Sequence, residues 1–189
     1  CVDTMASSAV LVFINGEFWG VYNFRERYSP EYVSDHTGAN KDTVTVIENA
    51  NNLYNQNPDV AFVDGSGVAG YADEFNWLLE FADTHDLSVP ENFAWIESKL
   101  DLDSLIDLCA VRVFFNATDW PENNIKLWRD TAPDGADARW HFVLLDTDWG
   151  MGMKQTTGPE MNLLFILLNY SNGTYTKDCP LTRLLHALR

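Results

Sequence analysis

The 189-residue sequence predicts a single α+β domain, residues 1–189, and three local patterns carry this prediction. Near the N-terminus two apolar runs, 10–14 and 17–24, are joined by Asn15-Gly16, a strong signal for a two-residue β-hairpin. From residue 71 to 115 the apolar residues recur at helical spacing. Two further strand-like runs then flank a turn-rich stretch. Separate blocks of strands and helices are typical of an α+β fold.

The first elements after the hairpin have recognisable boundaries. Ser29 is a candidate helix N-cap, Pro30 suits the first helical position, and Gly38 can end the helix. Residues 43–47 predict another strand. The stretch 49–70 is rich in Asn and Gly and has no periodicity, so we expect a loop there.

Three helices are predicted in the middle of the chain. The first buries one face, made of Tyr71, Phe75, Leu78, Leu79 and Ala82. The second begins after Pro90 and buries Phe93, Ile96 and Leu100. The third, about 103–115, is apolar nearly all round in its second half, which predicts a helix at the centre of a lobe. Two further helices are expected, near 162–168 and at the C-terminus.

Composition restricts the possible partners. A net charge of −16 disfavours nucleic acid and anionic membranes, and it favours metal cations and basic or neutral partners. An acidic surface that only maintains solubility would look the same. No apolar run is long enough for a transmembrane helix. Cys109 lies in an apolar helical run and is predicted to be a buried free thiol, and cysteine usage leaves the compartment open.

The segment 119–150 carries most of the chemical information. Asp119 is followed five residues later by Asn124, and a second apolar strand ends in Asp146-Thr-Asp148-Trp-Gly150. Protein kinases arrange their catalytic Asp, metal-binding Asn and metal-binding Asp in this order. We therefore expect Asp119 to orient an acceptor hydroxyl, and Asn124 and Asp148 to hold metal ions. Asp146 is expected to be a second metal ligand or to orient the loop.

Three blocks together resemble the spore-coat-protein kinase (CotH-like) family of atypical protein kinases. They are NGEFWGVYNFRER, LDLDSLIDLCAVRVFFNATDWPENNIKLWR and RWHFVLLDTDWGMG. The resemblance implies a protein-kinase-like fold that uses ATP and Mg²⁺ or Mn²⁺ to phosphorylate Ser or Thr hydroxyls of a protein. It also implies a spore-coat, cell-surface or secreted location rather than a cytoplasmic one. The chain departs from most kinases in lacking His-Arg before Asp119 and in having Trp149 in place of Phe.

The same resemblance implies how the lobes are divided. Residues 1–28 would form the hinge hairpin of the nucleotide lobe, with Asn23, Glu26 and Arg27 near adenine, and residues 29–189 would form a mainly helical C-lobe. None of the five lysines lies on a strand before this hinge. The resemblance therefore places the phosphate-binding Lys before residue 1, and the chain is expected to be a fragment that is inactive by itself.

Two other functions fit some of the same residues. A carboxylate glycoside hydrolase would use two of Asp119, Glu122, Asp146 and Asp148. A non-enzymatic module would bind glycans or a partner protein through aromatic side chains. The candidate aromatic residues are Trp19, Tyr22, Trp120, Trp128, Trp140 and Trp149, most of which are better interpreted as core residues.

Overall fold

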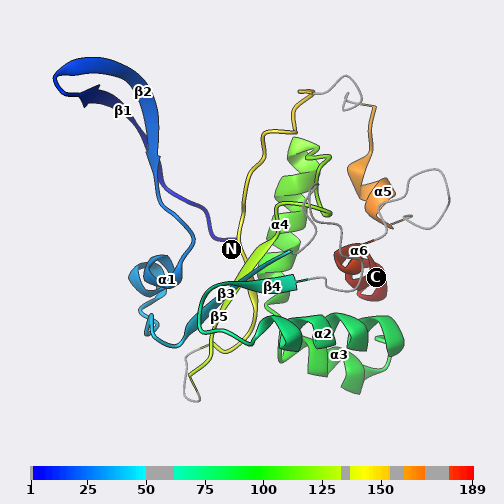
Figure 1. The fold of residues 1–189 in the computed structure, drawn as a ribbon. Coiled ribbons are helices and arrows are strands. Elements are labelled where there is room, and N and C mark those ends of the chain that lie inside the picture. The colour runs from blue at the N-terminus through cyan, green and yellow to red at the C-terminus, as the bar shows by residue number, and fades with distance from the viewer. Residues whose placement is uncertain (1, 50–61, 133–136, 154–159, 169–178) are drawn as a thin grey trace.

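The computed structural model describes residues 2–49, 62–132, 137–153, 160–168 and 179–189. These residues form two antiparallel sheets and six helices, a mixed α+β arrangement (Figure 1). Several elements appear within a few residues of their predicted bounds. They are the two strands in 10–24, the helix after Ser29 and the three helices in 71–115. Within the predicted 49–70 loop, the structure describes residue 49 and residues 62–70, and 50–61 lie outside the described residues.

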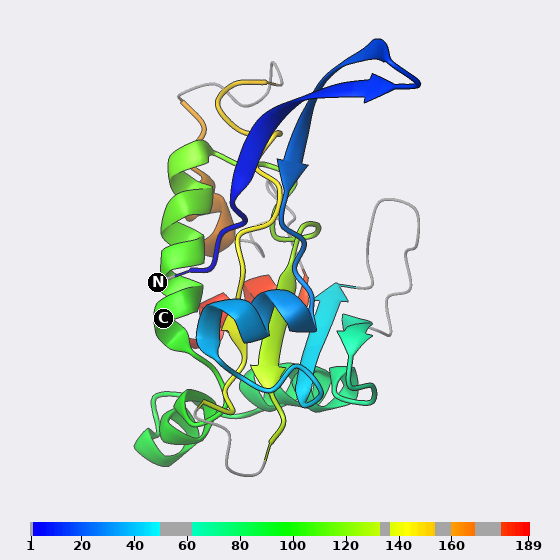
Figure 2. The ribbon, with the colours of Figure 1, turned by 90° about the vertical axis from the view of Figure 1, so that its left-hand side faces the viewer.

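The first sheet is a hairpin that projects from the rest of the molecule (Figure 1, Figure 2). Strands β1 (Ser7–Ile14) and β2 (Glu17–Arg25) pair antiparallel around Asn15 and Gly16, both of which have positive φ. This is the backbone that a type I′ turn requires. No other described strand pairs with the hairpin. Its apolar side chains are therefore exposed, Phe24 to 74%.

The second sheet has the order β4-β3-β5-β6, with all neighbours antiparallel. Its strands are β3 (Val44–Asn49), β4 (Phe62–Gly67), β5 (Lys126–Asp130) and β6 (His141–Phe142). The structure has strand β4 where the sequence predicts a loop. That prediction is wrong because the Gly-rich sequence of β4 has no strand periodicity. A Cβ on Gly67 would lie 2.1 Å from the carbonyl oxygen of Val44. The close pairing with β3 therefore requires a glycine there, and propensity alone could not predict it.

Short β6 also differs from the expected strand over 139–145. Its pairing with β5 is limited to Leu127↔Phe142 and Trp128↔His141. The residues on either side make single bridges to other segments, Trp140 to Leu100 and Val143 to Asp3. Trp140, Phe142 and Val143 of this run are buried, but its hydrogen bonds are divided among three partners.

The described residues also form six helices. Helix α1 (Pro30–Thr37) begins at N-cap Ser29 and ends at Gly38, which has φ 79°, as predicted. The others are α2 (Ala72–Thr84), α3 (Pro90–Glu97), α4 (Leu102–Phe115), α5 (Leu163–Leu168) and α6 (Pro180–Ala187). Helices α2 and α3 lie together at one end of the molecule, and α4 rises from there past the sheet (Figure 1).

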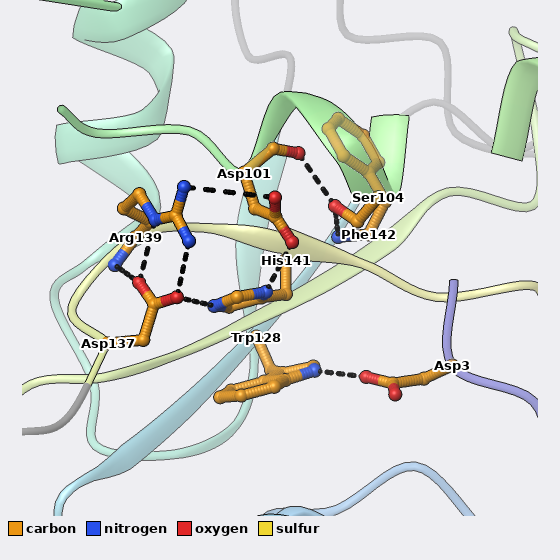
Figure 3. Close-up of polar contacts among 8 residues, drawn as sticks. All are labelled: Asp3, Asp101, Ser104, Trp128, Asp137, Arg139, His141 and Phe142. Carbon is orange, nitrogen blue, oxygen red and sulfur yellow. Dashed lines mark hydrogen bonds and ion pairs between the residues drawn. The ribbon is translucent and has the colours of Figure 1, made fainter. Parts of the chain in front are cut away.

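Helix α4 is fastened to β6 at its N-terminus (Figure 3). Asp101 precedes the helix, and its carboxylate contacts Nδ1 of His141 at 2.9 Å. The hydroxyl of Ser104 accepts a hydrogen bond from the backbone N–H of Phe142 at 3.0 Å. The imidazole of His141 stacks on Trp128 of β5, with ring centroids 4.4 Å apart. These contacts fix where the other end of α4 lies, and the candidate site is built at that end.

Burial along α4 is less uniform than its apolar sequence predicts. Leu105 and Leu108 are buried in the core, whereas Phe114 is 74% exposed. Cys109 is half-buried and free, and burial raises the pKa of its thiol to about 12. One face of the helix is therefore covered by the described residues, and the thiol is unreactive at neutral pH.

Candidate active site

A pocket of about 370 Å³ lies where three segments meet. The segments are the end of β3, the loop that follows α4, and the loop that follows β6. Its lining residues are Glu48, Asn49, Asp119, Asn123, Asn124, Ile125, Leu145, Asp146, Asp148 and Trp149. The structure thus brings together Asp119, Asn124, Asp146 and Asp148, which the sequence had separated by up to 29 positions.

The loop after α4 holds Asp119 and Asn124 against each other. Helix α4 ends at Asn116, whose left-handed backbone (φ 53°) turns the chain toward the pocket. Trp120 is completely buried and anchors the loop in the core. Asn124, also left-handed at φ 59°, donates from Nδ2 to Oδ2 of Asp119. An amide and a carboxylate five residues apart in sequence are thus direct neighbours.

Asn49 clamps this loop from the end of β3. Its Nδ2 donates to the carbonyl oxygen of Glu122 at 2.8 Å, and its Oδ1 accepts from the N–H of Ile125 at 3.2 Å. One side chain therefore satisfies backbone groups on both sides of Asn124. Sequence analysis missed Asn49, because an Asn at the edge of an Asn-rich stretch carries no local signal of a long-range clamp.

The loop after β6 turns sharply at Asp146 and Asp148. Asp146 has φ 33°, and its Oδ1 accepts from the N–H of Asp148 at 3.1 Å, which makes a local side-chain turn. The N–H of Met151 donates to the carbonyl oxygen of Phe115 at 2.7 Å. A Cβ on Gly150 would lie 2.5 Å from the same oxygen, so glycine is needed there for close approach to α4.

A buried arginine joins the two loops. Arg112 lies in the last turn of α4 with no exposed surface. Its guanidinium donates to the carbonyl oxygens of Asn124, at 3.0 Å, and of Leu145 and Asp146. Sequence analysis did not single out Arg112, although a charge in the apolar run LCAVRVFF was a usable signal, since Arg is rarely buried without partners.

Negative charge accumulates at the pocket. The pKa of Asp148 is raised above its usual value, first by partial desolvation and then by the hydrogen bond and the charge of Asp146 and the charge of Asp119. Burial lowers the pKa of Arg112, while Asp119 and Asp146 oppose that shift. Protonation or a bound cation therefore stabilises this cluster, because either one neutralises carboxylate charge.

The donor chemistry fits a magnesium or manganese ion. Carboxylate and amide oxygens are hard ligands, which Mg²⁺ and Mn²⁺ prefer. Within the described ranges, no group of three or more His, Cys, Asp or Glu side chains is arranged to hold a metal ion alone. A site of this kind would use one or two carboxylates with Asn124, and phosphate oxygens would complete the shell, which is usual for Mg²⁺.

The residues expected near adenine lie outside this pocket. Asn23 sits on β2 opposite Ala9. Glu26 accepts from the N–H of Ala6 at 2.8 Å and pairs with His36 at 2.9 Å, and these contacts lower its pKa. Arg27 lines a different pocket, of about 530 Å³, beside the start of α1. None of the three residues lines the pocket that contains Asp119.

The tryptophans are divided between core and surface. Trp120, Trp128 and Trp140 are buried, as the core interpretation predicts. Trp19 and Tyr22 on the hairpin are 61% and 49% exposed, so the core interpretation is wrong for them.

Comparison with known proteins gives one match that covers almost the whole chain. A family model described as CotH kinase protein matches residues 1–187. No curated protein matches the sequence.

Proposed function

The chain belongs to the CotH kinase family, and on that premise we propose that it carries the phosphoryl-transfer site of an ATP-dependent protein kinase acting on Ser or Thr hydroxyls. One observation carries the proposal. Asp119, Asn124 and Asp148 line a single pocket, and they follow one another in the order in which kinases place their catalytic and metal-binding residues. Family membership supports a kinase-like activity, and the geometry supports these three residues as its centre.

In this mechanism the residues mainly position and stabilise charge, because phosphoryl transfer requires little covalent chemistry from the protein. Asp119 would accept a hydrogen bond from the acceptor hydroxyl and take its proton as the hydroxyl oxygen bonds to the γ-phosphorus. The bond between that phosphorus and the bridging oxygen would break at the same time, and ADP would leave. Asn124 keeps Asp119 oriented through the amide hydrogen bond described above. Asn124 and Asp148, with Asp146 beside them, would hold Mg²⁺ or Mn²⁺. A bound ion supplies charge neutralisation on the phosphates.

The division into lobes is part of the proposal. Residues 29–189 would form the C-lobe and residues 1–28 the hinge hairpin, with Asn23, Glu26 and Arg27 contacting adenine. The exposed apolar side chains of the hairpin support this arrangement, since an isolated two-stranded hairpin is marginally stable and further strands would cover it. The phosphate-binding Lys would come from such strands.

Charge and family membership support one class of protein substrate and one kind of location. A net charge of −16 favours a basic acceptor protein rich in Ser or Thr and opposes nucleic acid. Within the described part of the chain, no helix combines the length and apolar character needed to cross a bilayer. We place the protein at a spore coat, a cell surface or outside the cell, in line with its family.

The proposal is tested by transfer of labelled γ-phosphate from ATP to a Ser-rich basic protein, using the complete natural protein. Asp119→Asn keeps the size of the side chain and removes the proton acceptor, so turnover should fall by about 10²–10⁴-fold. Nucleotide affinity should stay the same, because the metal-holding residues are intact. Asp35→Asn, an exposed Asp on α1, is the matched control and should retain wild-type turnover. Wild-type turnover in Asp119→Asn would exclude Asp119 as the base.

A further inference from the structure

Two residues with unusual backbone conformations face one buried side chain. Asn124 and Asp146 both have positive φ, 59° and 33°, which L-residues adopt rarely. Such conformations persist only where the surroundings hold them. The carbonyl oxygens of both residues accept hydrogen bonds from the guanidinium of Arg112. The strained peptides are therefore held by a side chain that belongs to neither loop.

From this geometry we propose that Arg112 is a positioning residue, which sets the distance between the Asn124 loop and the Asp146–Asp148 loop so that they can share a cation. The inference rests on the proposed function, since it assigns Arg112 to the same site. Arg112 does not line the pocket, so it acts through the residues that do.

The chemistry of the contact explains why the residue is an arginine. The guanidinium is planar and presents several N–H groups in a fixed fork, whereas a lysine offers a single compact charge. Arg112 uses Nη1 for Asp146 and Nη2 for Asn124 and Leu145, so the fork spans both loops. The negative charges of Asp119 and Asp146 lie close enough to the guanidinium to oppose the lowering of its pKa by burial.

Helix α4 supplies a second attachment beside the first. Its Phe115 carbonyl holds the N–H of Met151, and the Thr118 hydroxyl, just after the helix, donates to the carbonyl of Trp149 at 3.4 Å. Together with the bonds from Arg112 to Leu145 and Asp146, these contacts tie the loop after β6 to the end of α4 on both sides of Asp148. A helix fixed at its N-terminus by His141 can therefore serve as a rigid frame for both loops.

The test compares Arg112→Lys with Arg129→Lys. Arg129 is the matched control because it is also largely buried but pairs, at 2.7 Å, with Glu74 of α2, which belongs to neither loop. Mn²⁺ affinity is measured on the complete natural protein at a temperature where both variants are folded. We expect Arg112→Lys to weaken Mn²⁺ binding by about 10- to 100-fold, as loss of supporting contacts typically does, and Arg129→Lys to leave it unchanged.

Amide hydrogen exchange provides a readout that is independent of the proposed function. In Arg112→Lys, exchange should accelerate together in residues 122–126 and 145–151 and remain slow in α2. In Arg129→Lys, these two segments should keep wild-type protection. Unchanged exchange in both segments, or uniform acceleration over the whole chain, would overturn the inference.

The outcomes separate the two proposals. If wild-type protein binds no Mn²⁺, the metal site of the proposed function fails, and exchange alone decides whether Arg112 couples the loops. If Arg112→Lys does not fold, Arg112→Gln replaces it, since its amide keeps N–H donors without the charge. If neither variant folds while Arg129→Lys does, Arg112 has a general structural role and the inference is wrong.

Discussion

Replacing Asp148 with Asn should change the stability of the protein in opposite directions with and without a divalent cation. The pKa of Asp148 is raised by partial desolvation, by Asp146 and by Asp119. The folded protein therefore binds this proton more tightly than the unfolded chain does, and the contribution of Asp148 to stability falls as pH rises through its unfolded and then its folded pKa. At neutral pH the ionised side chain is destabilising, so Asp148→Asn should melt at the same temperature as metal-free wild type or higher.

The cation should reverse that order. A ligand that binds only the folded state, present at 100 times its dissociation constant, stabilises by about 2.7 kcal/mol. For a domain of this size, 1 kcal/mol shifts the melting temperature by roughly 2–4 °C, so wild type should gain roughly 5–11 °C. Asp148→Asn loses one of the two or three protein ligands and should gain little or nothing.

The assay is thermal unfolding at pH 7 over a series of Mg²⁺ and Mn²⁺ concentrations, with Ca²⁺ as a comparison. Asp35→Asn removes a carboxylate from an exposed position on α1 and controls for the change in net charge. It should show the full wild-type shift. A shift of equal size in Asp148→Asn would remove Asp148 from the metal site, and a wild-type protein insensitive to every concentration would refute the metal site altogether.

Three further changes have defined outcomes. Asn124→Ala removes the amide bonded to Asp119 and should reduce Mn²⁺ affinity in a calorimetric titration, without the metal-free stabilisation expected of Asp148→Asn. Gly150→Ala forces a Cβ to 2.5 Å from a carbonyl oxygen and should destabilise by about 1–3 kcal/mol in urea unfolding. Asp137, whose pKa is lowered to about 2 chiefly by its hydrogen bond to Arg139, stabilises the protein above its unfolded pKa. That contribution disappears as pH falls toward 2, so Asp137→Asn should flatten the decline in melting temperature across this range.

Local signals in the sequence predicted those parts of the fold that local interactions determine. Asn15-Gly16 forms the expected hairpin turn, and helix α1 begins and ends at its predicted caps, Ser29 and Gly38. These residues act through their own backbone preferences, which are known from the residue type alone. The partial exposure of α4 was not predictable in the same way, because Phe114 shows that an apolar run does not reveal which of its faces a neighbour covers.

Features that depend on distant partners were missed. Strand β4 exists because β3 supplies its hydrogen bonds, and its glycines contribute close approach and no strand propensity. Asn49 and Arg112 act on backbone groups more than ten residues away in sequence. A charged residue in an apolar helix indicates that it has buried partners, but only the folded structure shows which residues they are.

Antiparallel pairing explains why the order of motifs in the sequence could nevertheless locate the site. Strand β5 begins where the Asn124 loop ends, and β6 leads into the loop that contains Asp146 and Asp148. Because Leu127 pairs with Phe142, continuing the register by three residues brings Asn124 level with Leu145. Two loops distant in sequence thus emerge at the same end of one strand pair, and Arg112 bonds to the carbonyls of these two facing residues. Any insertion between β5 and β6 that keeps their register should preserve the site, whereas a one-residue slip would move Asp148 away from Asn124 and reverse the face on which each side chain lies.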